Sequence, residues 1–378
     1  MKNLRLLPAV LAFSLILMTG CEKETVDTPN SNSNLPSSGV KTGSQDYEKS
    51  AEQELNSKLD VNLEFGNIVE PTECGNTAFD YWFNDELSDW TGTSYNYARL
   101  SLAMFDLPTY DALVFVNSSE GQYFGKDGEH TQIMTKTFKD LNRFWDIDSD
   151  DIVLGAMHGD MLQDRDKVIR TYVAAYGMPT ATAEYYADLV LAALDTYPEY
   201  RDGNHPIFTL NAFAQNSFEY PPYGINGVIP AKIIMGDGIV KGFTDLGFED
   251  VAPQAILAHE YGHQIQFQRN VFDDGPRTAE KTRRTELMAD ALAAYYLSHA
   301  RGATMQWKRV KQFLQVFYDI GDCGFSSTGH HGTPLQRMAA AEWGYKLADN
   351  AKKQGKILSS EQFIQLFDAK LPELVAVP

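Results

Sequence analysis

The chain of 378 residues has only three cysteines, few basic residues and no hydrophobic run long enough to cross a membrane. None of the cysteines has the spacing of zinc ligands, which excludes a cysteine zinc site. Only 32 Lys and Arg face 51 Asp and Glu, giving a formal net charge of −19. This acidity argues against a nucleic-acid partner and leaves the substrate unspecified.

The apolar run from Leu6 to Met18 is too short to span a bilayer and is typical of a secretory signal, residues 1–20. It ends in Met-Thr-Gly-Cys21, which resembles the cleavage box of bacterial lipoproteins. We therefore expect a lipid on Cys21 that anchors the protein in the bacterial cell envelope, at the outer membrane, facing the periplasm or the surface. The alternative is a soluble secreted protein with an incidental cysteine.

Residues 21–45 are rich in Ser, Asn, Thr and Pro and predict a flexible tether, because they hold too little apolar content to fold. The other two cysteines, Cys74 and Cys323, form a candidate disulfide in an oxidising compartment. Sequence alone leaves their pairing open, since it does not place their α-carbons within bonding distance.

The most informative stretch is residues 255–266, which carries His259, Glu260 and His263. On a helix, two histidines four residues apart lie on one face and can hold one divalent metal, most often zinc. Glu260 then lies beside the metal as a candidate general base. Asp250 is a candidate cap for this helix, and Pro253 suits its first turn. The competing interpretation is a core helix that carries two histidines.

A second predicted helix, residues 281–300, supplies acidic groups. Glu286 and Asp290 are four residues apart, so they also share a face. Glu286 is a candidate third metal ligand, and Asp290 can accept the free ring N–H of a ligand histidine. Alternatively, Glu286 is a solvated charge beside Arg283 and Arg284.

Three ordered blocks, residues 259–266, 284–290 and 331–337, resemble the neutral zinc metallopeptidase family of bacteria. This family belongs to the gluzincins, whose pattern is His-Glu-x-x-His followed by Glu-x-x-x-Asp. The similarity covers residues 233–344, under a third of the chain. It implies a zincin-like catalytic domain with peptidase activity.

The resemblance also implies roles for individual residues. One Zn²⁺ ion is held by His259, His263 and Glu286, with Glu260 as general base and Asp290 supporting a ligand histidine from behind. The chain departs from the family pattern after Asp290, where Ala291 and Ala294 stand in place of the usual cysteine and glycine. This departure argues less against membership of the family than against the transfer of its peptidase activity to this chain.

His331 lies at the end of a glycine-rich loop, residues 321–332, and matches the third block of the family. It can stabilise the oxyanion that forms when water attacks a carbonyl, with His330 as the competing donor. Both histidines can alternatively be exposed loop residues. Thr333 suits the cap of a helix that has Pro334 in its first turn, and Arg337 is expected to orient the loop.

The whole pattern predicts an α+β protein that is mainly helical, with a small sheet. Residues 46–190 form a mixed helical region of unknown role, and residues 191–378 form the zincin-like domain. A strand at residues 231–235 is expected either at the sheet edge, where it binds substrate backbone, or buried. The other predicted elements are a strand at 111–117 and helices at 46–59, 131–145, 165–176, 183–197, 305–318, 333–353 and 359–369.

Two further segments invite a functional interpretation that we do not favour. Residues 146–151 begin like a calcium loop, but Asp151 replaces the required glycine and Met157 replaces the bidentate glutamate. We interpret them as the capped start of a helix. His158 is interpreted as structural.

The function expected from these features is zinc-dependent hydrolysis of peptide bonds, with a peptide or protein as substrate. One alternative is a lipid-anchored binding or scaffold lipoprotein with a structural zinc site. Another is a zinc hydrolase that cleaves non-peptide amides of the cell wall.

Overall fold

The computed structural model describes residues 76–219, 227–272, 278–305, 307–319, 331–351 and 355–376. The described part is mainly helical, with one sheet of three strands and another of two, which confirms the α+β class. The predicted helix at 46–59, all three cysteines and His330 lie outside the described residues. No helix among the described residues is both long and apolar enough to cross a membrane.

The first half of the described chain is mostly helical. Its elements are α2 (Ala78–Glu86), α3 (Gly92–Asn96), η2 (Tyr97–Ser101), α4 (Leu107–Phe115), α5 (Thr131–Phe144), β1 (Val153–Met157), η3 (Gly159–Gln163), α6 (Arg165–Tyr176), α7 (Thr180–Thr196), η4 (Pro198–Gly203) and η5 (Pro206–Thr209).

The second half holds the remaining strands and the longest helix. Its elements are β2 (Ala212–Gln215), β3 (Phe218–Glu219), β4 (Val228–Ile229), β5 (Lys232–Gly236), α8 (Asp237–Phe243), η6 (Thr244–Phe248), α9 (Ala252–Gln268), α10 (Ala279–Ser298), α11 (Trp307–Asp319), α12 (Pro334–Ala351) and α13 (Ser360–Val375).

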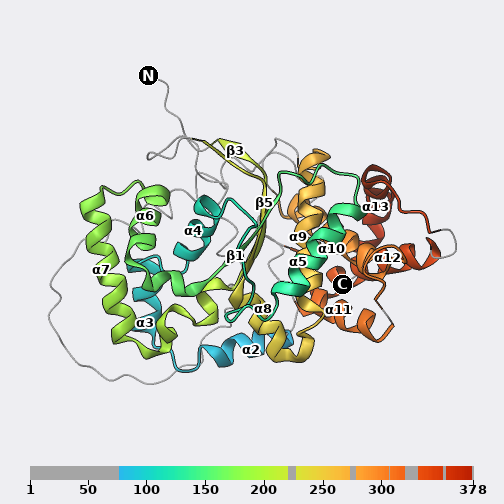
Figure 1. Cartoon of the computed structure of the whole chain (residues 1–378). Helices are drawn as coiled ribbons and strands as arrows, with labels where there is room; N and C mark the ends of the chain where they lie inside the picture. The colour runs from blue at the N-terminus through green and yellow to red at the C-terminus, as the bar shows by residue number, and fades with distance from the viewer. Residues whose placement is uncertain are drawn as a thin grey trace.

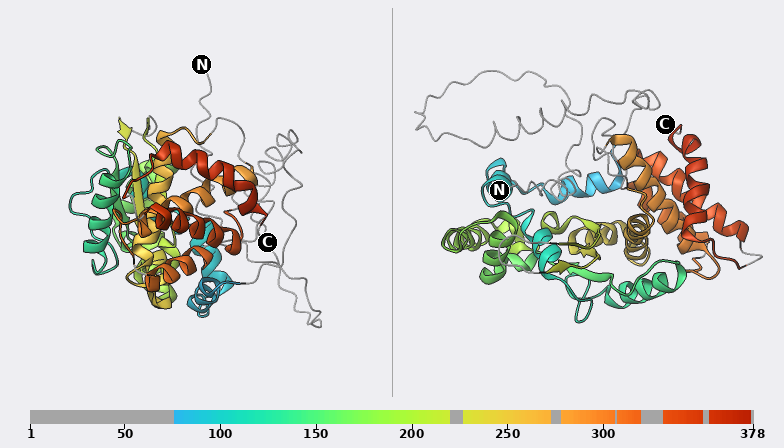
Figure 2. Two further views of the ribbon diagram at one scale, coloured as in Figure 1. Left: turned by 90° about the vertical axis from the view of Figure 1, so that its right-hand side faces the viewer. Right: turned by 90° about the horizontal axis from the view of Figure 1, so that it is seen from above.

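The three-stranded sheet stands between two groups of helices (Figure 1). Helices α3, α4, α6 and α7 lie on one side of it, and α5 and α9 to α13 lie on the other. Seen from above, the C-terminal helices gather at one end of the molecule and α6 and α7 at the other (Figure 2). The sheet therefore joins the two helical parts.

β5 is the central strand of this sheet, in the order β1-β5-β2. It pairs in parallel with β1, Val153 opposite Lys232, and antiparallel with β2, Ala212 opposite Met235. The prediction that residues 231–235 form an edge strand is therefore wrong, and the alternative of a buried strand holds. β1 pairs with the other edge of β5, although it lies about 80 residues earlier in the chain. No local sequence pattern reveals so distant a pairing.

The strand predicted at 111–117 is also wrong, because these residues lie in and just after helix α4. Residues 112–116 form a short continuous apolar run, and every residue from 107 to 114 is buried, so periodicity alone does not assign the segment to helix or strand. Pro108 in the first turn favours the helix. The buried Lys232 ties the C-terminal end of α4 to β5, since its Nζ donates to the carbonyls of Leu113 and Val116.

Most helices predicted within the described residues are confirmed to within about three residues, whereas α13 continues six residues past its predicted end at residue 369. α6 has the predicted bounds because both ends carry strong signals: Asp164 accepts from two backbone N–H groups at the start, and Gly177 adopts a φ of 64° at the end. Ser359 and Gln362 form the predicted capping box of α13.

The boundary predicted between residues 190 and 191 falls inside α7. Strands from before and after that point form one sheet, and one hydrophobic cluster runs from Phe79 to Val375. The two predicted regions therefore share their core.

The acidic loop at 146–151 is followed by strand β1, so the helix predicted after it is wrong. Asp146 Oδ1 instead accepts from the backbone N–H of Ser360, at the start of α13. Gln268 at the end of α9 bonds the backbone of Asp148. The loop thus connects elements distant in sequence.

A buried histidine in the first helical group predicts a pH dependence of stability. His205 Nδ1 accepts from Ile207 N and Nε2 bonds the carbonyl of Glu86, so the neutral ring is satisfied. Burial lowers the pKa of His205 to about 4. The unfolded chain therefore takes up a proton first as pH falls, and stability is lost between about pH 6.5 and 4, by about 3 kcal/mol at most.

Urea unfolding of the parent and of His205→Gln, whose amide can make the same two hydrogen bonds, measures this effect. The variant is expected to lose less stability than the parent between pH 7 and pH 4. Equal losses in the two proteins would show that His205 does not carry it.

Candidate metal centre

The candidate ligands lie on two helices that approach unusually closely. An ideal Cβ built on Gly262 of α9 would lie 3.0 Å from the Cα of Ala289 in α10. Only a glycine allows this contact without displacing a helix. The close contact brings the face of α9 that carries His259 and His263 against the face of α10 that carries Glu286.

The surroundings of α9 explain its almost complete burial. It packs between β2, α5 and α10, and all but one of residues 252–266 are buried. Pro253 lies in its first turn as predicted, but Val251 is the N-cap and no side chain caps the helix. The predicted cap, Asp250, instead forms an ion pair with Arg309 of α11.

The three predicted ligands present their donor atoms to one point. His259 Nε2 and His263 Nε2 are 3.2 Å apart, and the oxygens of Glu286 lie 3.3 Å from the first and 3.5 Å from the second. A tetrahedral site with bonds of about 2.0–2.1 Å has edges of about 3.3–3.4 Å between ligand atoms. These residues therefore form a buried group that can hold a metal ion.

Hydrogen bonds behind the two imidazoles fix which ring nitrogen faces the centre. Gln266 Nε2 donates to the carbonyl of Thr285, so its Oε1 faces His263 Nδ1 at 2.9 Å and accepts from it. Asp290 Oδ1 accepts from His259 Nδ1 at 2.8 Å. In the neutral rings both Nε2 atoms then carry lone pairs directed at each other and at Glu286, an arrangement that needs a cation between them.

Asp290 is itself held by Arg337 of α12. Arg337 donates from Nη2 to Asp290 Oδ1 at 2.6 Å and from Nε to Oδ2 at 2.7 Å. The two side chains are 2% and 0% exposed. We expected Arg337 to orient the His331 loop; in the structure it holds the carboxylate that orients His259.

The loop before α12 is fixed by its own capping residues. Thr333 and Gln336 form a reciprocal box, in which each side chain accepts from the backbone N–H of the other residue. Gly332 has a φ of 99°, and a Cβ there would lie 3.1 Å from Leu287. This packing brings the half-buried His331 beside α10, close enough for its charge to lower the pKa of Glu286.

The charges within the centre depend on one another. Burial would raise the pKa of Glu286, but the neighbouring imidazoles of His263 and His331 hold it well below its usual range. Burial would lower the pKa of His259, but hydrogen bonds to Asp290 and Glu286 raise it to about 9. A proton thus meets the need for positive charge in the metal-free site, and metal binding must compete with it.

Glu260 differs from the other acidic groups. It is buried, its Oε2 has no hydrogen-bond partner among the described residues, and burial raises its pKa. A buried carboxylate oxygen without a partner is costly unless the site uses it. The alternative of Glu286 as a solvated surface charge is wrong, because Glu286 is only 3% exposed.

Sequence reasoning missed Gln266 as the partner of the His263 ring. Its signal was its position three residues after His263, on the same helix face. The two departures from the family pattern, Ala291 and Ala294, are fully buried. Ala291 lies against Gly344 of α12; a Cβ on Gly344 would lie 2.2 Å from the carbonyl oxygen of Ala291, so only glycine fits at position 344 unless a helix shifts.

Gly262→Val tests whether the close contact of α9 with α10 builds the centre. The added side chain must push α10 away, which we expect to cost about 1–3 kcal/mol of stability and to weaken zinc binding at least tenfold. Chelator competition measures the zinc affinity. The control is Gly92→Val, where a Cβ meets nothing within 4 Å; unchanged zinc affinity in both variants would contradict this account.

Comparison of the chain with protein-family models, with curated proteins and with solved structures gives no match to any of them.

Proposed function

We propose that the protein is a zinc-dependent metallopeptidase of the gluzincin type. The observation that carries the proposal is the convergence of His259, His263 and Glu286 on one point, beside the buried carboxylate of Glu260. Two imidazoles and a carboxylate are a donor set that suits catalytic zinc, and three protein ligands leave a fourth position for water or substrate. Bound zinc would act as a Lewis acid toward water and a carbonyl group.

The protein's own groups supply the proton transfers. Glu260 would accept a proton from the attacking water and pass it to the leaving amine. His331, just before α12, would donate a hydrogen bond to the oxyanion. Gln266 and Asp290 keep the two imidazoles in the orientation that the reaction needs.

The strand that suits substrate binding is β2 rather than β5. β2 forms the edge of the sheet beside α9, and Gln264 of α9 donates to the carbonyl of Gln215 at the end of β2. The carbonyl of Asn211 accepts from the backbone N–H of Gly236 in β5. Along an antiparallel strand, the backbone groups of successive residues point alternately toward and away from the partner strand. The N–H and C=O groups of Ala212 and Ala214 therefore point away from β5. An extended peptide that pairs there would pass beside the residue that follows His263.

The buried Glu260 favours an enzyme over a scaffold lipoprotein with a structural zinc, since a structural site has no use for a base. The edge of β2 favours peptides over non-peptide amides of the cell wall. We further propose that Cys21 carries the lipid that holds the protein in the bacterial envelope, with residues 21–45 as its tether.

The test is digestion of an unfolded polypeptide, reduced casein, and in parallel of purified peptidoglycan. We expect new amino termini from casein, loss of activity with a zinc chelator, and recovery when zinc is returned. Release of non-peptide fragments from peptidoglycan with intact casein would favour the cell-wall hydrolase instead. A zinc-loaded protein that cleaves neither would contradict the hydrolase.

A further inference from the structure

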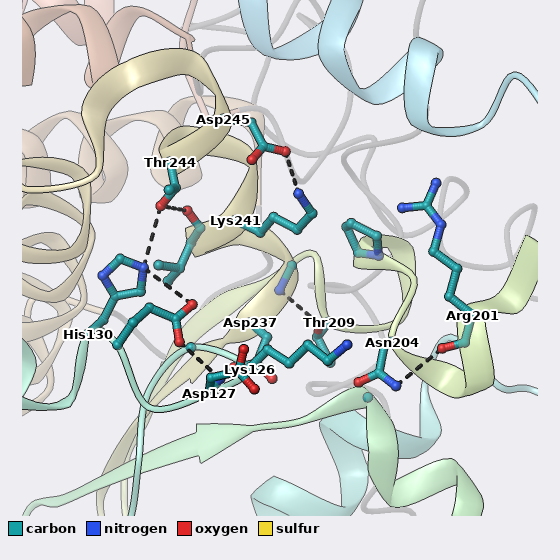
Figure 3. Close-up of a pocket in the computed structure, with 16 residues that line it drawn as sticks. Lys126, Asp127, His130, Arg201, Asn204, Thr209, Asp237, Lys241, Thr244 and Asp245 are labelled. Carbon is teal, nitrogen blue, oxygen red and sulfur yellow. Dashed lines mark hydrogen bonds and ion pairs between the residues drawn. The ribbon is translucent and has the colours of Figure 1, made fainter.

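A separate cavity of about 410 Å³ lies where strands β1 and β5 end. Its walls come from the loop before α5, from η4 and η5, and from α8 with η6 (Figure 3). Asp237, the first residue after β5, lies at the floor of the cavity. Gly159, the second residue after β1, also lines it. Crevices outside the carboxyl ends of parallel strands are a recurrent place for ligands.

This cavity is distinct from the candidate metal centre. Gln264, next to His263, donates to the carbonyl of Lys232 at the start of β5. Asp237 lies five residues further along the same strand direction. At about 3.3 Å per residue, Lys232 and Asp237 are separated by roughly 16 Å, and none of the metal-centre residues lines the cavity.

A fixed pair of polar side chains marks the cavity floor. Asp237 Oδ2 accepts from His158 Nδ1 at 2.7 Å, and the ring of Tyr123 stacks on His158 with centroids 4.0 Å apart. The other oxygen, Asp237 Oδ1, is buried and has no hydrogen-bond partner among the described residues. An acceptor held in this way calls for a donor from a ligand.

The remaining charges indicate what kind of ligand fits. Lys241 is paired with Asp245, and Arg201 with Glu86, so these bases are already neutralised. Lys126, Asp127 and Asp237 also line the cavity, so it is lined by both acidic and basic side chains (Figure 3). A strongly charged ligand would meet repulsion from one set of groups. Hydroxyl groups both donate and accept, and they can satisfy acids and bases in turn.

We propose that this cavity binds a small neutral polyhydroxylated molecule, a monosaccharide or the terminal unit of a glycan. Asp237 Oδ1 accepts from one hydroxyl group, and Lys126 donates to another. His158 and Tyr123 hold Asp237 in place from behind. The site gives the protein a second ligand class, independent of the proposed hydrolysis.

Saturation-transfer NMR of the purified protein with glucose, galactose, mannose and N-acetylglucosamine, with glycine ethyl ester and methyl phosphate as charged probes, tests the proposal. At least one sugar is expected to bind, with an affinity at least tenfold lower in Asp237→Asn. The control is Asp188→Asn, whose carboxylate pairs with Arg165 on an exposed helix face; it should bind as the parent does.

Lys126→Ala provides a second variant, because Lys126 is exposed and its replacement does not endanger the fold. It should weaken sugar binding severalfold, and this result decides the question if Asp237→Asn fails to fold. Binding of the amine or phosphate probe alone, binding of no probe, or sugar affinities unchanged in both cavity variants would each overturn the proposal.

Discussion

Glu260→Gln is expected to lower kcat on peptide substrates by about 10²–10⁴-fold, the usual contribution of a general base. Glutamine has the same size, but its amide does not accept the proton of the attacking water. Because Glu260 is not among the three residues whose donor atoms converge, the variant should keep its zinc.

The matched control is Gln254→Glu, which changes an amide to an acid on the same helix, α9. Gln254 is the one residue between 252 and 266 that is not buried. This variant should retain the parent kcat. Loss of zinc from Glu260→Gln would instead show that Glu260 serves the metal, and full activity would remove it from the reaction.

Arg337→Met is expected to destabilise the folded protein by about 3–5 kcal/mol, because it leaves the buried carboxylate of Asp290 without its partner. The same change removes support from His259, so zinc affinity should fall about 10–100-fold. Urea unfolding measures the first effect, and chelator competition the second.

An exposed ion pair provides the comparison. Arg165→Met breaks the pair between Arg165 and Asp188, whose side chains are 41% and 60% exposed, and should change the stability of the protein little, because water screens an exposed pair. Equal losses of stability in the two variants, or parent zinc affinity in Arg337→Met, would contradict the role we assign to Arg337.

The sequence was sufficient for the metal-capable group because its geometry is local. Four-residue spacing on a helix determines that His259 and His263 share a face, and the same holds for Glu286 and Asp290. That the two faces meet depends on Gly262 and Ala289, whose close contact is a tertiary fact. The two helices could be linked from the sequence only through the family resemblance, which implied that His259, His263 and Glu286 hold one metal ion.

The sheet could not be predicted in the same way. The pairing of β1 with β5 joins residues about 80 positions apart, and the sequence of neither strand indicates which strand it pairs with. The apolar run in α4 was assigned to a strand because complete burial removes the alternation that separates helix from strand. Similarly, Arg337 was recognised in its block, but its contact with Asp290 spans 47 positions.

The most direct test of the account is the zinc content of the purified protein beside that of Glu286→Ala. We expect about one zinc ion per chain in the parent and a large loss in the variant, which keeps both histidines but lacks the third ligand. A well-folded parent that binds no zinc, even when zinc is supplied, would contradict the central claim that His259, His263 and Glu286 form a metal centre.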